Sequence, residues 1–298
     1  MTPPFVNQPF TVVDGGLSTA LDDLGHRPEG LLWTAQLVID RPDVLVQAHR
    51  TFVDAGADVI ISASYQASVD GFIAAGLNAK AARSALASTT ELARRSGARF
   101  VASSIGPFGA ALGDGSEYHG RYAADWDEVR AFHRSRFQVL ANTGPDLFAI
   151  ETIPSAIEAE IVLDELVRAT QLPAWLCVTC VDEGTTCAGD TIEAVAQLAA
   201  TAPTIAAFGV NCTHPRHVTG LLQRAASATS LPLVAYPNHG RTWDAQRECW
   251  VGDHTDQLTT RVGEWILHGA RLIGGCCGVG APDVARLVGA RAALGFAS

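Results

Sequence analysis

Apolar runs alternate with helical patterns along most of the chain. Four joins share one arrangement, in which a helix end is followed by a glycine, one to three residues and an apolar run: DAGADVIISAS, RRSGARFVASS, ANTGPDLFAIET and LHGARLIGGCC. A glycine after a helix is typical of a left-handed C-terminal cap, and the apolar runs have the length of buried strands. The pattern therefore predicts alternating helices and strands, as in a mostly parallel sheet buried on both faces.

The same pattern predicts eight strands, at residues 11–13, 58–62, 100–105, 147–150, 174–179, 206–210, 233–235 and 271–274. Dividing 298 residues by eight gives about 37 residues per unit, which suits a (β/α)₈ barrel, the TIM barrel. An open doubly wound sheet is the alternative, but the first predicted strand lacks the GxGxxG pattern that follows it in that fold. We therefore expect an α/β protein with a single (β/α)₈ barrel domain over residues 1–298.

Three cysteines lie at predicted strand ends. Cys276 and Cys277 follow an apolar run and are flanked by glycines, whose backbone freedom permits a turn that brings both sulfurs to one object. Cys212 ends the run AAFGVNC, 64 positions earlier (276 − 212). Because barrel strands end at one rim, three thiols there predict a zinc site with an open fourth position. The alternative is a small buried hydrophobic residue, which we prefer for Cys177 and Cys180 because they lie three apart in one strand.

Other polar side chains are predicted at the same rim. Asp14 and Glu151 each follow an apolar strand and precede a helix. Either carboxylate therefore caps a helix or meets a ligand, and the two together suit an ammonium group. Further residues at strand ends are Ser64, Tyr65 and Asn211. The long glycine-rich loop over residues 105–122 has no Walker lysine, so we expect it to cover a substrate instead of cradling a phosphate.

The composition favours small-molecule chemistry. Hydrophobic residues make up 48% of the chain and charged residues 17%, enough for a large core. The net charge of −10, with no basic run, argues against nucleic-acid and anionic-membrane partners. No apolar run approaches the roughly 20 residues of a membrane span, and the N-terminal residues do not resemble a secretion signal. The seven cysteines are an odd number, so we expect reduced thiols in a cytoplasmic protein.

Taken together, these motifs resemble the homocysteine S-methyltransferase family, of the type that uses S-methylmethionine or S-adenosylmethionine as the methyl donor. The matching stretches run in order from Asp14 to Asp283: DGGLSTALDDLG, GADVIISASYQAS, SIGPFGAALGDGSEYHGRY, IETIPS, GVNCTHP, YPNHGRTWD and LIGGCCGVGAPD. The pair GVNC and GGCC is highly specific. SEYHGRY and YPNHGRTWD are more similar to the sulfonium-using branch than to the betaine-using branch.

The resemblance implies a barrel that holds one zinc ion (Zn²⁺) per chain. Cys212, Cys276 and Cys277 would be its ligands and the catalytic residues, with the homocysteine thiolate as the fourth ligand. Asp14 and Glu151 would bind the ammonium group of homocysteine. The other substrate-binding residues would be Gly15, Trp33, Ser64, Tyr65 and Asn211.

The reaction that the resemblance implies is methyl transfer from a sulfonium donor to zinc-bound homocysteine, which gives methionine. Aromatic residues suited to contact the sulfonium by cation–π attraction are Trp33, Tyr65, Phe108, Tyr118 and Trp243. The alternatives are selenocysteine as acceptor, betaine as donor, or a non-catalytic barrel whose cysteines hold a structural zinc or sense redox state. The C-terminal extension of the betaine-using relatives is missing, so we expect a monomer or homodimer that binds small molecules.

Overall fold

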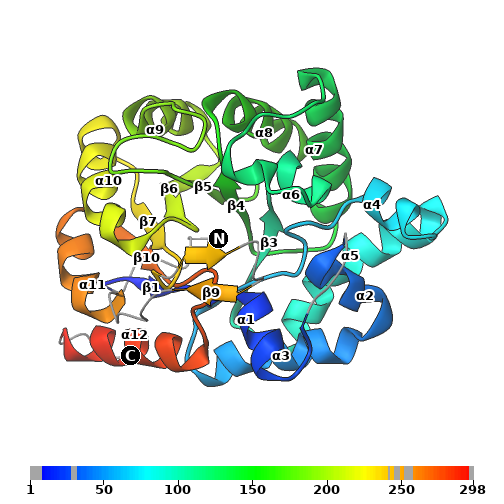
Figure 1. Ribbon diagram of the computed structural model, residues 1–298, viewed down its shortest axis with the longest axis horizontal. Coiled ribbons are helices and arrows are strands. Elements are labelled where there is room, and N and C mark those ends of the chain that lie inside the picture. Colours follow the sequence, from blue (N-terminus) through cyan, green and yellow to red (C-terminus); the bar gives the residue numbers. More distant parts are fainter. Residues whose placement is uncertain (1–8, 28–31, 241, 245–248, 252–257, 295–298) are drawn as a thin grey trace.

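Eight parallel strands form the centre of the molecule, with helices around them (Figure 1). The computed structural model describes residues 9–27, 32–240, 242–244, 249–251 and 258–294. The barrel strands are β1 (Thr11–Val12), β2 (Val59–Ile61), β3 (Phe100–Ile105), β4 (Leu147–Ile153), β5 (Ala174–Val178), β6 (Ile205–Asn211), β7 (Leu233–Tyr236) and β10 (Ala270–Ile273).

The order of these strands in the sheet is β1-β10-β7-β6-β5-β4-β3-β2. A parallel bridge between Val13 and Val59 then joins the two edge strands. Each neighbouring pair is parallel, so all eight carboxyl ends lie at one rim. The predicted (β/α)₈ barrel is confirmed.

Helices follow the strands around the barrel. They are α1 (Leu17–Asp23), α2 (Gln36–Asp40), α3 (Pro42–Asp54), α4 (Val69–Ala74), α5 (Ala79–Arg95), α6 (Phe108–Leu112), α7 (Trp126–Leu140), α8 (Ala156–Ala169), α9 (Ile192–Thr201), α10 (Pro215–Ala228), α11 (Leu258–Leu267) and α12 (Ala281–Ala293). Two short 3₁₀ turns are η1 (Trp33–Ala35) and η2 (Ser116–Tyr118), and a two-stranded antiparallel hairpin, β8 (Thr242–Asp244) with β9 (Cys249–Val251), lies between β7 and α11 in the sequence.

The four helix–glycine–strand joins have the backbone that the sequence predicts. Gly56, Gly97, Gly144 and Gly269 all have positive φ, between 69° and 96°. Residues with a Cβ rarely adopt this conformation, so the glycines let each helix stop and the chain enter the next strand.

The core has two layers, one inside the barrel and one between strands and helices. Trp175 and Tyr236 fill part of the interior, where the Trp175 indole donates a hydrogen bond of 3.0 Å to the Tyr236 hydroxyl. Cys177 packs inside the barrel, whereas Cys180 belongs to the outer layer. The two thiols therefore point to opposite sides of the strand, as the spacing predicts.

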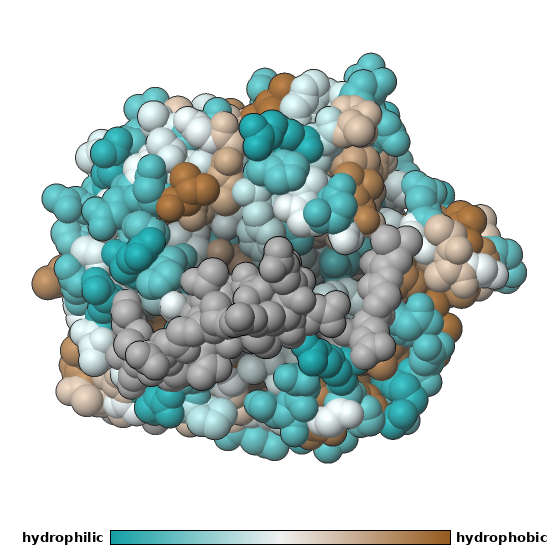
Figure 2. Space-filling model, in the orientation of Figure 1, coloured by the Kyte–Doolittle hydropathy of each residue, from teal (hydrophilic) through white to brown (hydrophobic). Residues whose placement is uncertain are grey.

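On the face of the molecule seen in Figure 2, hydrophilic residues cover most of the described surface and apolar residues lie in separate patches. Among the described residues, no helix combines the length and the apolar character needed to span a membrane.

Candidate active site

The structure brings the three predicted metal ligands together. Cys212 directly follows β6, and Cys276 and Cys277 follow β10. The Sγ atoms of Cys212 and Cys277 are 3.7 Å apart, and those of Cys276 and Cys277 are 4.0 Å apart. All three sulfurs lie within 4.8 Å of one another and are half-buried. Side chains 64 positions apart in the sequence (276 − 212) thus form one cluster.

A turn after β10 aims both neighbouring cysteines at this cluster. The amide of Val279 donates to the Cys276 carbonyl at 3.0 Å, which closes the turn. Gly278 has a φ of 79°, and a Cβ there would overlap the ring of His239. Because an ordinary side chain fits neither the backbone nor the space, glycine at 278 is needed for the turn.

The thiols influence one another's ionisation. Hydrogen bonds from the thiols of Cys212 and Cys276 lower the pKa of Cys277 well below its usual value. The hydrogen bonds of Cys276 to the other two sulfurs raise its own pKa well above the usual range. Without a cation, the cluster therefore favours one thiolate stabilised by two thiols.

Asp14 reaches the same rim from the end of β1. Its side chain is buried, and its Oδ2 accepts a hydrogen bond of 2.8 Å from the amide of Ile61. Its Oδ1 is buried without a hydrogen-bond partner. Burial, together with the charge of Glu151, raises the pKa of Asp14 well above its usual value. A buried carboxylate oxygen without a partner is unfavourable, so it is suited to receive a donor from a ligand.

Glu151 lies within β4, which continues to Ile153; the predicted strand end at residue 150 is therefore too early. Its Oε1 accepts a hydrogen bond of 2.5 Å from the Ser104 hydroxyl. Burial raises the pKa of Glu151 to about 7. Glu151 is not the N-cap of α8, because the Ser155 hydroxyl has that role. The capping alternative for Glu151 is therefore wrong.

Asn211 is fully buried and bound to the protein itself. Its Oδ1 accepts from the amide of Thr152 at 2.6 Å, and its Nδ2 donates to the Thr152 hydroxyl at 2.8 Å. Thr152 and Cys212 both have positive φ, 61° and 47°, which is rare for residues with a Cβ. Asn211 thus links the strained backbone after Glu151 to the strained backbone at Cys212.

The other predicted substrate-binding residues occupy different environments. Ser64 is fully buried, and its hydroxyl donates to the Ser104 carbonyl at 2.8 Å. Burial, followed by the charges of Glu117 and Cys212, raises the pKa of Tyr65 well above its usual value. Its phenol therefore lies within electrostatic reach of the cysteine cluster.

Gly15 and Trp33 lie on either side of α1 in the sequence. A Cβ on Gly15 would overlap the Val279 carbonyl, so the backbone passes close to the turn after β10. Trp33 begins η1, and 40% of its surface is exposed. The lining role of Trp33 stays a prediction, and the side chain of Trp243 lies outside the part of the chain that the structure describes.

A buried cation beneath the rim was missed at the sequence level. Arg136 on α7 is fully buried and donates to the carbonyl oxygens of Gly106 at 2.7 Å, Ser64 at 2.7 Å and Tyr65 at 3.0 Å. It thereby holds together the segments that follow β2 and β3. The sequence contains an indication of this role, because Arg136 interrupts the buried apolar stripe of α7.

The glycine-rich loop after β3 extends to the cysteines. The Tyr118 hydroxyl lies 3.6 Å from the Sγ atom of Cys212. Both ends of the loop are fastened by Glu158, a fully buried residue of α8. Glu158 accepts hydrogen bonds from the Phe108 amide at 2.6 Å and from the Tyr122 hydroxyl at 2.5 Å. Both ends of the loop are thus anchored to α8, and its role as a substrate cover stays a prediction.

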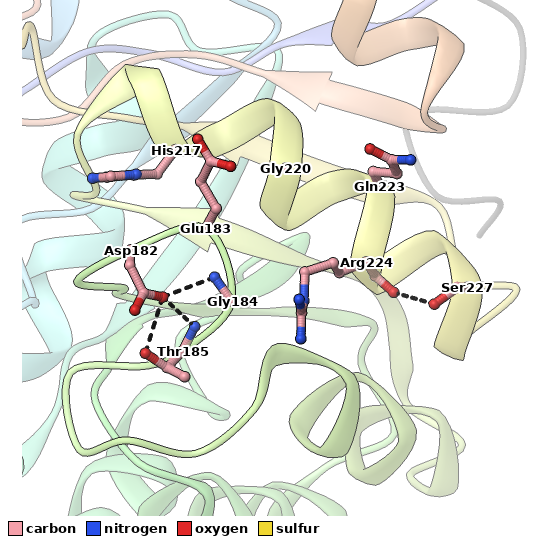
Figure 3. A pocket seen from close by; sticks show the side chains of 9 residues that line it. All are labelled: Asp182, Glu183, Gly184, Thr185, His217, Gly220, Gln223, Arg224 and Ser227. Carbon is pink, nitrogen blue, oxygen red and sulfur yellow. Dashed lines mark hydrogen bonds between the residues drawn. The ribbon is translucent and has the colours of Figure 1, made fainter.

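A separate surface pocket lies between the loop after β5 and α10 (Figure 3). It is lined by none of the predicted site residues. The Asp182 side chain at its edge accepts hydrogen bonds from the amides of Gly184 at 2.8 Å and Thr185 at 2.7 Å, as Figure 3 shows. This carboxylate therefore stabilises a local turn.

Comparison with known proteins gives one consistent result. The family model for homocysteine S-methyltransferase matches residues 11–290. Homocysteine S-methyltransferase 4 of Zea mays is 40% identical over 289 residues, which cover 89% of this chain and 84% of that protein. The homocysteine S-methyltransferase of Escherichia coli (strain K12) is 36% identical over 293 residues, 94% of each chain. The crystal structure of the metallated E. coli homocysteine methyltransferase MmuM has a TM-score of 0.84 at 35% identity, with 94% of this chain and 96% of that chain covered. The chain belongs to the homocysteine S-methyltransferase family.

Proposed function

We propose that this protein is a zinc-dependent enzyme that transfers a methyl group from a sulfonium donor to homocysteine and so forms methionine. The observation that carries the proposal is the cluster of Cys212, Cys276 and Cys277 at the carboxyl rim of the barrel. Family membership supports the acceptor, and the chemistry of the site supports the metal and the donor class.

The three thiols fit a tetrahedral zinc site. With a Zn–S bond of about 2.3 Å, two sulfurs of a tetrahedron are about 3.8 Å apart. The sulfur of Cys277 lies 3.7 Å from that of Cys212 and 4.0 Å from that of Cys276. Thiolates are soft ligands that favour zinc, and three of them at these distances require a cation to balance their charge. Zinc held here would lower the pKa of the homocysteine thiol and so supply a thiolate at neutral pH.

Asp14 and Glu151 are proposed to hold the ammonium group of homocysteine. Asp14 has a buried oxygen without a partner, and burial, followed by repulsion from the Glu151 carboxylate, raises the pKa of Asp14. An ammonium group placed between them would supply donors and relieve that repulsion. Such binding leaves the sulfur of homocysteine free to extend towards the cysteines.

The reaction needs little proton transfer. The homocysteine thiol first loses its proton to solvent. Its sulfur then forms a bond to the donor's methyl carbon while the bond from that carbon to the sulfonium sulfur breaks. The electron pair of the broken bond stays with the donor sulfur, which leaves as a neutral thioether. The task of the protein is therefore to align the two sulfurs and exclude water.

A donor and metal assay tests the proposal. Purified protein is given homocysteine with S-methylmethionine, S-adenosylmethionine or betaine, each with and without chelator, and methionine and zinc are measured. We expect methionine from a sulfonium donor, about one zinc per chain, and loss of both with chelator. Turnover that survives complete zinc removal would reject the metal assignment. If methionine forms with betaine and with neither sulfonium compound, the sulfonium donor is rejected.

Two further measurements address the remaining expectations. Replacing homocysteine by selenocysteine tests the alternative acceptor. We also propose that the chain acts as one domain. We further propose that the protein is a monomer or homodimer, and light scattering after size-exclusion chromatography tests this oligomeric state.

A further inference from the structure

One carboxylate of the rim has no role in the mechanism described above. Glu117 lies in η2, between Ser116, which is buried, and Tyr118, which is exposed. Its Oε2 is buried and has no hydrogen-bond partner. Buried polar atoms in folded proteins are nearly always paired, so an unpaired carboxylate oxygen beside an active site is suited to a ligand.

Glu117 lies close to the cysteines at which the methyl transfer is proposed to occur. The neighbouring residue Tyr118 brings its hydroxyl to 3.6 Å from the sulfur of Cys212. Burial, followed by the charge of Cys212, raises the pKa of Glu117 to about 7. The charge of Glu117 in turn acts on Tyr65 and Tyr118. A carboxylate and two phenol rings thus gather next to one of the cysteines, and both kinds of group attract a cation.

This carboxylate has no cationic neighbour to balance it among the described groups that act on it. Those groups are Cys212 and Asp114, which carry negative charge when ionised. The buried guanidinium of Arg136 donates to backbone carbonyls instead. Asp14 and Glu151 are assigned to the ammonium group of the acceptor, so a second cation is needed to offset the charge of Glu117.

The position of Glu117 is also fixed by the fold. Glu158 binds the Phe108 amide at 2.6 Å on one side of η2 and the Tyr122 hydroxyl at 2.5 Å on the other. The loop that carries Glu117 is therefore fastened at both ends to α8.

We propose that Glu117 is the anionic partner of the sulfonium group of the methyl donor, and hence a residue that determines donor specificity. The inference rests on the proposed function, because it assumes a cationic donor. Tyr65 and Tyr118 would complete the site by presenting aromatic surface to the same cation. Methyl transfer turns the sulfonium into a neutral thioether, so the attraction to Glu117 disappears when the product forms. The loss of this attraction favours release of the thioether.

The test compares Glu117→Gln, which keeps the shape and removes the charge, with Glu117→Asp, which keeps the charge. Glu91→Gln removes an exposed carboxylate on α5 and is the control for net charge. Steady-state kinetics give KM for S-methylmethionine and for homocysteine, and calorimetry compares the binding of S-methylmethionine with that of methionine, which lacks the sulfonium charge. Thermal unfolding and metal content show whether the fold and the cysteine site are intact.

We expect Glu117→Gln to raise the donor KM about tenfold, which corresponds to about 1.4 kcal/mol, with little change in the homocysteine KM, the metal content or the Tm. The preference for S-methylmethionine over methionine should be lost in Glu117→Gln and partly kept in Glu117→Asp. An unchanged donor KM, or equal weakening of S-methylmethionine and methionine, would overturn the assignment. If the wild type transfers no methyl group from a sulfonium donor, the proposed function fails, and calorimetry with S-methylmethionine still decides the role of Glu117.

Discussion

Replacement of Arg136 by leucine is expected to destabilise the barrel strongly. The guanidinium is fully buried and makes three hydrogen bonds of 2.7–3.0 Å to the carbonyls of Gly106, Ser64 and Tyr65. A hydrogen bond to a charged group contributes roughly 1.5–3 kcal/mol, and a carbonyl left buried without its donor costs about 1–3 kcal/mol. Leucine removes the desolvation penalty of the guanidinium, which offsets part of the loss. The net decrease in the free energy of unfolding should be about 3–5 kcal/mol, as for other broken buried charge networks.

Urea and thermal denaturation measure this change. A loss of 3–5 kcal/mol corresponds to a decrease in Tm of roughly 5–8 °C for a protein of 298 residues. Arg134→Leu is a matched control on the same helix, because 48% of the Arg134 side chain is exposed and its partner Glu165 also binds Arg130 and Arg168. Solvent screens such pairs, so the control should be little affected. Equal stability of the two variants would refute the structural importance of the buried guanidinium.

Arg136 should also influence substrate binding through charge. Its positive charge lowers the pKa of Glu151, which burial otherwise raises, giving a value of about 7. Without that charge, Glu151 keeps its proton to higher pH, so a larger fraction of it is neutral at pH 7. Arg136→Leu should therefore raise the homocysteine KM at neutral pH, with partial recovery in alkaline buffer. If the homocysteine KM is raised equally at every pH, the cause is displacement of the backbone that Arg136 holds and not the charge state of Glu151.

Two further predictions address the rim itself. Cys212→Ala should remove zinc and activity while leaving the circular dichroism spectrum unchanged, because the barrel core does not depend on the metal; zinc retained at the wild-type level would contradict the ligand assignment. Glu151→Gln should abolish tight homocysteine binding yet stabilise the metal-free protein above pH 7. The pKa of Glu151 is raised from 4.5 to about 7 on folding, so protonated Glu151 favours the fold at low pH and that contribution is lost as the pH rises through 7. At about 1.4 kcal/mol per pKa unit, the neutral glutamine should be more stable by up to about 3 kcal/mol at pH 8 and no more stable at pH 4, and denaturation at the two pH values measures the difference.

The barrel and its cysteine cluster were predictable because their signals are local in the sequence. The glycine after each helix marks where a strand begins. Cys212 directly follows β6, and Cys276 and Cys277 follow β10 after two glycines. Parallel strands of a closed barrel end at one rim, so residues distant in sequence are brought together by the topology alone. Observed strand bounds differ from the predicted ones by a few residues, most at β4, where the register shifts between Ile150 and Ile153.

The sequence by itself determined the fold class, the family and the set of thiols, since hydrophobic periodicity and strand-end motifs need no knowledge of contacts. Only the tertiary structure decided what the remaining polar groups do. Asn211 has the position of a ligand-binding residue in the sequence, but its amide is bonded to Thr152 across the rim. The role of Arg136 follows from its burial and its hydrogen bonds to carbonyls of other segments, and that of Glu117 from a buried carboxylate oxygen without a partner. The local sequence pattern predicts the strand or helix on which a residue lies. Its charge state and hydrogen-bond partners depend on tertiary packing, which is complete only when the barrel closes.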